Sequence, residues 1–292
     1  MKFITSFFLI FTILILTSFT PEKPAYQFFN AKGKKADYSD LLKDALKADV
    51  VFFGELHNNP ICHWLQLELT RDLYARNDKK LILGAEMFEA DDQLILNEFL
   101  SKTIRTKNFE DEAKLWNNYK TDYRPLAEFA RDSGVPFIAT NIPRRYASMV
   151  HMGGFEALDK LPADAKKYIA PLPVEYDFNL PGYKAMLDMK DEGAGKAGMN
   201  QNLPKAQAIK DATMAWFISQ NLEKGKIFLH FNGAYHSNDY EGIIWYLRKL
   251  NPDLKILTIS SEEQKDPDDL KEDYENQADY ILITPESMTK TY

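Results

Sequence analysis

Two of the five histidines in this 292-residue chain follow a glycine by three positions, in Gly-x-x-His sequences that end at His57 and His236. Imidazole binds transition metals and exchanges protons near neutral pH, and glycine lets the backbone turn sharply beside a ligand. The carboxylates of Glu55 and Glu86 could supply oxygen ligands or act as a general base. One such histidine alone is often structural, but the pair predicts a functional pocket in which His57, His236 and Glu86 hold a metal ion.

Other polar residues follow a predicted strand or share a helix face. An arginine such as Arg144, close behind Asn141 at a strand exit, could clamp a carboxylate or propionate; surface salt bridges are the alternative. Gln207 and Asp211 stand at i and i+4 on one helix, as a pocket lining would. Tyrosine can ligate haem iron, and Tyr235 lies inside the second Gly-x-x-His sequence, although packing is the simpler role. We expect these five residues to contact a bound cofactor.

The remaining histidines have simpler interpretations. His63 lies in the first turn of a predicted helix, where it is either exposed to solvent or a supporting partner of the pocket. We expect His230, inside a predicted strand, to be buried in the sheet. His151 lies near a helix end, where a cationic side chain interacts favourably with the helix dipole.

These residues can converge only if the elements that carry them share one edge of a sheet. Most of the predicted strands are continuously apolar, as strands covered on both faces are; they span 49–53, 81–86, 135–140, 226–231, 254–260 and 279–284. Helical patterns fill the gaps, at 60–76, 91–100, 110–119, 124–133, 143–152, 204–221 and 240–250. The alternation predicts an α/β fold, with a mostly parallel central sheet flanked by helices and a ligand site beyond the carboxyl ends of its strands.

One stretch, about 161–201, interrupts this alternation. It is rich in proline and glycine and has weak periodicity. Long irregular segments in compact domains are usually functional or mobile, so we expect an irregular, lid-like insertion. No repeat or linker divides the rest of the chain, which predicts a single domain over 25–292.

The net charge argues against nucleic acid as a partner, and the N-terminal segment indicates export. The formal charge of −7 argues against nucleic acid as a partner, because phosphate binding needs clustered Lys and Arg. Lys2 and the apolar run behind it predict a signal peptide over 1–20. A retained anchor is the alternative, although about 20 apolar residues are normally needed to span a bilayer; membrane contact would then occur only through this segment.

Cysteine usage refines the predicted location. The only cysteine, Cys62, lies far beyond the apolar run, so no lipid-acceptor cysteine follows that run and no intramolecular disulfide can form. We therefore expect an exported protein, periplasmic or associated with the cell envelope, that is not a lipoprotein. Its stability must come from the core, which this length permits.

The motifs taken together resemble the ChaN-like, iron-regulated haem-binding proteins, part of a wider group with the Tiki metalloproteases and erythromycin-esterase-like enzymes. The resemblance covers about 49–236, and its order and spacing are more specific than any single motif. It is carried by 54–59 with His63 and Gln66, by 86–88, 123–126 and 141–144, by Gln207, Ala208, Asp211, Met214 and Ala215, and by 233–236. It implies an α/β fold and haem held by tyrosine at the interface of a homodimer.

Three functions remain open on this basis. The first, favoured by the resemblance, is an exported haem- or iron-binding protein that serves haem or iron acquisition. The second is a metal-dependent hydrolase, a peptidase or esterase, in which His57 and His236 hold Mn, Co or Zn with Glu55 or Glu86 and activate water. The third is a binding protein for another small ligand, in which the histidines only form hydrogen bonds.

Overall fold

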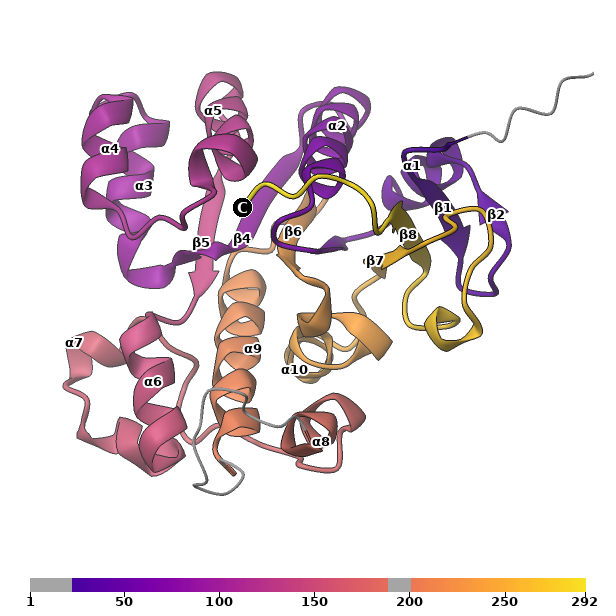
Figure 1. Ribbon diagram of the computed structural model, residues 1–292. Coiled ribbons are helices and arrows are strands. Elements are labelled where there is room, and N and C mark those ends of the chain that lie inside the picture. Colours follow the sequence, from indigo (N-terminus) through magenta and orange to yellow (C-terminus); the bar gives the residue numbers. More distant parts are fainter. Residues whose placement is uncertain (1–22, 189–200) are drawn as a thin grey trace, which may run out of the picture.

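The computed structural model describes residues 23–188 and 201–292 (Figure 1). The predicted signal peptide, 1–20, and residues 189–200 of the predicted insertion lie outside the described residues. No helix in the described ranges is long and apolar enough to cross a membrane.

A single mixed sheet forms the centre of the described chain, with strands in the order β2-β1-β8-β7-β3-β6-β4-β5. Every neighbouring pair from β8 to β5 is parallel, whereas β1 is antiparallel to both of its neighbours. The strands are β1 (Gln27–Asn30), β2 (Lys35–Ala36), β3 (Val50–Glu55), β4 (Leu81–Glu89), β5 (Phe137–Asn141), β6 (Ile227–Gly233), β7 (Ile256–Gln264) and β8 (Tyr280–Pro285). The predicted mostly parallel sheet is confirmed, and all six predicted strands are present.

Helices cover both faces of this sheet, as the alternation predicted. In Figure 1, α2 to α5 lie on one side of the sheet and α6 to α10 on the other. The helices are α1 (Tyr38–Ala45), α2 (Pro60–Arg76), α3 (Gln93–Leu100), α4 (Thr106–Glu112), α5 (Arg124–Ser133), α6 (Arg144–Gly153), α7 (Ala163–Lys166), α8 (Pro181–Asp188), α9 (Leu203–Gln220) and α10 (Ile243–Leu250).

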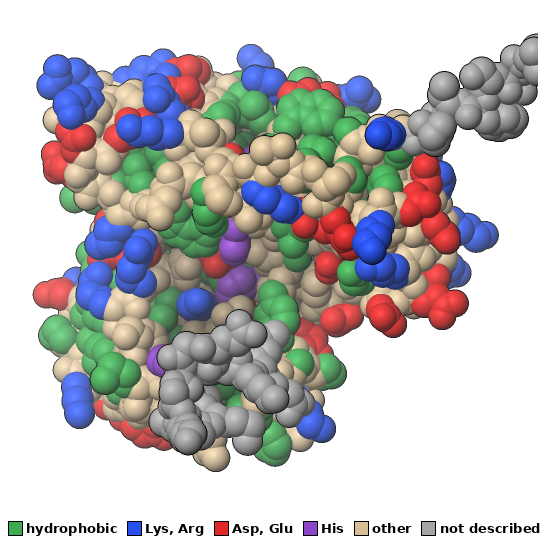
Figure 2. Space-filling view, viewed as in Figure 1, with side chains coloured by type: hydrophobic (Ala, Val, Ile, Leu, Met, Phe, Trp, Pro, Cys, Tyr) green, Lys and Arg blue, Asp and Glu red, His purple; other side chains and the backbone are tan. Residues whose placement is uncertain are grey.

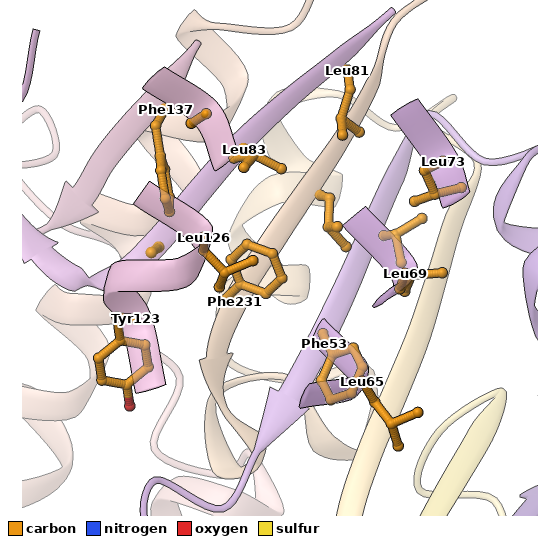
Figure 3. Packing of buried hydrophobic residues seen from close by; sticks show 14 of the residues in the cluster. Phe53, Leu65, Leu69, Leu73, Leu81, Leu83, Tyr123, Leu126, Phe137 and Phe231 are labelled. Atoms are coloured by element: carbon orange, nitrogen blue, oxygen red, sulfur yellow. The ribbon is translucent and has the colours of Figure 1, made fainter. Parts of the chain in front are cut away.

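The main core lies between the sheet and the layer of α2 and α5. Phe53 of β3 and Phe231 of β6 pack in one buried cluster with Leu69 of α2 and Leu126 of α5 (Figure 3). Each fully buried side chain of this size contributes about 1.5–3 kcal/mol. This packing fixes the strands whose carboxyl ends carry Glu55 and Gly233.

The predicted helix over 110–119 is wrong. Helix α4 ends at Glu112, and Ala113, which follows it, has the extended backbone angle ψ of 149°. A π-helical turn, η2 (Tyr119–Tyr123), precedes α5 instead. The local apolar pattern is overridden by the buried side chain of Asn118, which donates to the His57 carbonyl at 2.8 Å and to Asp122 at 2.7 Å.

The described part of the predicted insertion packs against the domain. Helix α8 contacts α9, and the buried Tyr183 hydroxyl donates a 2.7 Å hydrogen bond to Asp211. Ala165 and Ile169, in and just after α7, are buried in a cluster with α6. Residues 161–188 are therefore a mostly irregular cover over α9.

Candidate functional site

The two Gly-x-x-His sequences lie side by side at the carboxyl edge of the sheet. In the β3–β6 ladder Glu55 is the register partner of Gly233, so the chain leaves both strands at the same level. The absence of a side chain at Gly233 makes room for His57, because an added Cβ would lie 2.8 Å from Cε1 and 2.9 Å from Nε2 of that ring. The sequence-based prediction that these two motifs meet agrees with this register.

A cleft of about 700 Å³ opens at this edge, between β3, β6 and α9. Figure 2 shows histidine side chains in a hollow at the centre of this face. We call it the His57–His236 cleft; its lining comprises Glu55, Leu56, His57, Asn58, Met186, Gln207, Lys210, Gly233, Ala234, Tyr235, His236, Asn238, Glu262 and Tyr292.

His57 is partly exposed and is oriented by Glu55. Its Nδ1 lies 2.9 Å from Glu55 Oε1, and 37% of its side chain is accessible to solvent. Burial alone would lower the pKa of His57, but the bond to Glu55 and the charge of Glu86 raise it above its ordinary value. The side of the ring that carries Nε2 lies against Gly233 at the cleft.

Glu55 is completely buried and accepts several hydrogen bonds. Tyr123 and Gln66 each donate to it at 2.6 Å. Burial opposes its ionisation, but the charge of His63 and the bond to His57 hold the pKa of Glu55 below its ordinary value. The ionised Glu55 carboxylate therefore holds the His57 ring in place.

His236 lies between two carboxylates. Its Nδ1 lies 2.5 Å from Asp211 Oδ1, and its Nε2 lies 3.2 Å from Glu86 Oε1. Burial would lower the pKa of His236, but the charges of Glu86 and Asp211 raise it to about 10. His236 is thus an imidazolium at neutral pH with both ring nitrogens engaged.

The two carboxylates beside His236 differ in their surroundings. Glu86 also accepts the Gly233 amide at 2.8 Å; burial disfavours its charge, but His236 and His57 hold its pKa below the ordinary value. Burial dominates at Asp211 and raises its pKa, although His236 and the Tyr183 hydroxyl favour the ionised form.

The predicted site residues fall into two neighbouring pockets. Glu55, His57, Gln207, Tyr235 and His236 line the His57–His236 cleft, while Glu86 and Asp211 lie directly behind it. Asn141 and Arg144 instead line an adjacent pocket of about 490 Å³, which we call the Asn141 pocket. The side chain of Lys210 contributes to both pockets.

Tyr235 and Gln207, two residues of the predicted set, both line the cleft. Tyr235 is 40% exposed and donates to the Gly182 carbonyl at 2.5 Å, which links the second Gly-x-x-His sequence to α8. The Gln207 amide lies 3.0 Å from Nδ1 of His236. Both contacts are consistent with a lining role, and whether either residue touches a cofactor stays a prediction.

Two of the three histidines outside the pair, His230 and His63, have structural roles. His230 is fully buried in β6, its Nε2 lies 2.8 Å from Thr140, and burial lowers its pKa to about 4. His63 is buried too, with Nε2 3.1 Å from the His57 carbonyl and Nδ1 3.1 Å from Gln66. Of its two expected roles, His63 has the supporting one.

Two further residues shape the site, and no site role was predicted for either. Tyr123 reaches Glu55 from 68 positions away, and no local pattern marks such a contact. Lys210 could have been found, because it lies one turn after Gln207 and hence on nearly the same helix face.

Within 23–188 and 201–292, no group of three or more His, Cys, Asp or Glu side chains is arranged to hold a metal ion. The nitrogens of His236 are engaged by carboxylates, and Glu55 is surrounded by donors. The predicted divalent-metal alternative with Mn, Co or Zn therefore has no support from the described geometry.

Comparison with known proteins adds one curated relative and similar folds. Protein RETICULATA-RELATED 5, chloroplastic, of Arabidopsis thaliana is 30% identical over 146 residues, which are 48% of this chain and 19% of that protein. The chain thus matches about a fifth of that relative's length. Among solved structures, "Cofacial heme binding to ChaN of Campylobacter jejuni" has a TM-score of 0.66 at 18% identity and covers 89% of this chain and 96% of that one.

A more distant solved structure is an erythromycin esterase, EreC, with a TM-score of 0.46, 10% identity, and coverage of 89% of this chain and 82% of that one. The similarity to the Campylobacter ChaN structure confirms the α/β fold. The family described as "Haem-binding uptake, Tiki superfamily, ChaN" matches residues 41–247, well over half of the 292 residues. The protein therefore belongs to the ChaN family of haem-binding uptake proteins, within the Tiki superfamily.

Proposed function

We propose that this protein binds haem in the His57–His236 cleft and serves haem or iron acquisition from the cell envelope. Membership of the haem-binding ChaN family is the observation that carries the proposal. The residues of the cleft are compatible with such a group. Its volume of about 700 Å³ lies within the range of about 300–1,000 Å³ of small-molecule and cofactor sites.

His57 is the histidine best placed to act as an iron ligand. A metal-ligating histidine almost always donates its second ring N–H to a carboxylate or carbonyl, which orients the ring. Glu55 provides that carboxylate at Nδ1, and the His57 ring lines the cleft with Nε2 beside Gly233. Haem would supply an iron that histidine or tyrosine side chains can bind.

Two tyrosines of the cleft offer the other ligand type. Tyr235 and Tyr292 both line it and are 40% and 66% exposed. His236 is unsuited to ligation, since both of its nitrogens are engaged by Asp211 and Glu86. Asn141 and Arg144 lie in the adjacent pocket, so their contact with the cofactor stays a prediction.

Titration of the purified protein with haemin tests the binding. We expect a shift of the Soret band that saturates at a defined stoichiometry. Sedimentation of the same samples tests whether a homodimer holds the haem, as the family resemblance implies. A spectrum equal to that of free haemin at every concentration, including those that favour dimers, would overturn the proposal.

The role in acquisition needs a test in cells. A strain whose only iron source is haemin should grow better with the intact gene than with a version lacking codons 2–20. Equal growth of both strains, with equal protein amounts, would contradict a role that depends on export. The growth experiment does not test haem binding itself, which the haemin titration tests separately.

A further inference from the structure

The Asn141 pocket lies beside the His57–His236 cleft, at the carboxyl ends of β4 and β5. Its volume is about 490 Å³. Helices α6 and α9 form its sides, and the lining is Glu89, Trp116, Asn141, Ile142, Arg144, Ala147, Ser148, His151, Leu203, Ala206 and Lys210. Ligands of parallel α/β sheets bind at this edge.

Two buried acceptor atoms line this pocket without a donor. Glu89 and Asn141 are register partners in the β4–β5 ladder, so they stand beside each other at the strand ends. They are only 3% and 8% exposed. Within the described residues, Glu89 Oε2 and Asn141 Oδ1 accept no hydrogen bond. Because buried acceptors without partners are costly, this part of the pocket favours a ligand that donates.

The charge of Glu89 is only partly balanced at that oxygen. Arg144 Nε bonds its other oxygen, Oε1. Oε2 lies 3.8 Å from the Lys114 ammonium, which is beyond hydrogen-bond distance. A simple anion would be repelled by the Glu89 carboxylate, whereas a cationic N–H group would donate a hydrogen bond to Oε2.

Lys210 gives the pocket an opposite charge on its α9 side. No carboxylate of the described chain lies within 4.0 Å of its ammonium, in contrast to Lys114. A carboxylate on the ligand would gain a charge-assisted hydrogen bond there. Much of the remaining lining is apolar and comes from Trp116, Ile142, Leu203 and Ala206.

We infer that the Asn141 pocket binds a small α-amino acid with an apolar side chain. The ammonium group donates to Glu89 Oε2 and Asn141 Oδ1, the carboxylate accepts from Lys210, and the side chain lies along Trp116 and Ile142. The pocket shares Lys210 with the His57–His236 cleft, but the inference does not depend on haem binding there.

Three matched probes test which groups are recognised. Calorimetric titration of the full chain with L-leucine should give saturable binding. L-Leucinamide, which lacks the carboxylate, and 4-methylpentanoate, which lacks the ammonium, should each bind at least about tenfold more weakly. Absence of binding by all three would mean that water satisfies Glu89 and Asn141, and would overturn the inference.

Two variants assign the contacts to their residues. Lys210→Met should weaken L-leucine about tenfold and leave L-leucinamide unchanged, because the amide never used the lysine charge. Asn141→Leu should weaken both amines and spare 4-methylpentanoate. Lys224→Met, at the exposed turn after α9, removes the same charge and should leave all three affinities unchanged.

Urea midpoints separate loss of recognition from loss of folding. The Lys210 and Lys224 variants are expected to unfold within a few tenths of a molar of the wild type, because both side chains lack buried partners. Equal leucine affinity in wild type and Lys210→Met, with 4-methylpentanoate bound as tightly as leucine, would contradict the assigned recognition.

Discussion

At the scale of single residues, His57 and His236 share one cleft but have opposite roles. His57 has one nitrogen bonded to Glu55 and a side chain that is partly exposed in the cleft, as a ligand-binding group needs. His236 is buried and held at both nitrogens, so it balances the charges of Glu86 and Asp211. The same Gly-x-x-His pattern thus supplies a candidate ligand in one case and a counter-charge in the other.

The buried charge of His236 predicts a pH-dependent stability. Its pKa is about 10 in the folded protein and about 6.5 when unfolded. This stabilisation is complete below pH 6.5 and is lost as the pH rises through 10. Urea unfolding between pH 6 and 10 should show the decline in the wild type and a flatter profile in His236→Gln.

At pH 7 the His236→Gln variant should be less stable by about 3–5 kcal/mol, because it leaves two buried carboxylates without their cation. His151→Gln, outside the cleft, serves as the control and should keep the wild-type decline. An unchanged pH profile in His236→Gln would show that the imidazole is neutral in the folded protein.

Gly233 controls the position of His57. A Cβ at this residue would approach the imidazole to 2.8 Å, so Gly233→Ala must move the ring from its place beside Glu55. We expect haemin affinity to fall about tenfold or more, with little change in folding, because the φ of −56° suits alanine. Haemin titration of both proteins measures the change.

A double-mutant cycle separates this steric effect from others. In a His57→Ala background, Gly233→Ala should cause no further loss of haemin affinity, because the added methyl group then has no ring to displace. Additive losses would show that Gly233 acts through another contact.

At the scale of elements, α2 connects the first Gly-x-x-His sequence to the sheet. The buried Asn59 accepts from the amides of Ile61 and Cys62 and donates to Glu263 at 2.9 Å and Thr284 at 2.8 Å. One side chain therefore caps the helix and joins it to β7 and β8.

Removal of this cap should destabilise the protein strongly. Asn59→Ala should cost about 2–4 kcal/mol, since it removes an N-cap of about 1 kcal/mol and leaves buried groups without partners. Asn77→Ala, at the other end of α2, removes a single exposed bond to Lys80 and should cost under about 1 kcal/mol. Chemical denaturation compares the two; equal losses would contradict a special role for Asn59.

Residues that start or end helices explain which elements could be predicted from the sequence. Helices α2 and α5 match their predicted bounds, because Pro60 marks a first turn and Gly134, with a φ of 69°, ends a helix. The predicted helix over 110–119 is wrong, and near its end Asn118 donates to the distant His57 carbonyl, a contact that no local pattern encodes. Strand β2 covers only 35–36, too few residues to show a period.

The candidate site, too, has features that local sequence signals predict and features that depend on tertiary packing. Motif spacing and strand exits were enough to place His57 beside the segment that carries His236. The division into two pockets could not be predicted, because it depends on tertiary packing: Trp116, a lining residue of the Asn141 pocket, packs against His57, and Lys210 lines both pockets.

At the scale of the whole molecule, the cleft lies at the carboxyl edge of the sheet, between β3, β6 and α9, and α8 packs against α9. Figure 1 shows α8 beside α9. The proposed location depends on the N-terminal segment instead. In a bacterial host, the exported protein should lack about the first 20 residues, the usual length of a signal peptide. Mass spectrometry of the cell fractions measures this; full-length protein confined to the cytoplasm would contradict export.

The central claim is that the His57–His236 cleft binds haem, with His57 as its ligand. The most direct measurement is a haemin titration of wild type, His57→Ala and the control His151→Ala, followed by the Soret band. We predict saturable binding to wild type and His151→Ala, and at least tenfold weaker binding with an altered Soret position in His57→Ala. Identical titrations of all three proteins would contradict the account.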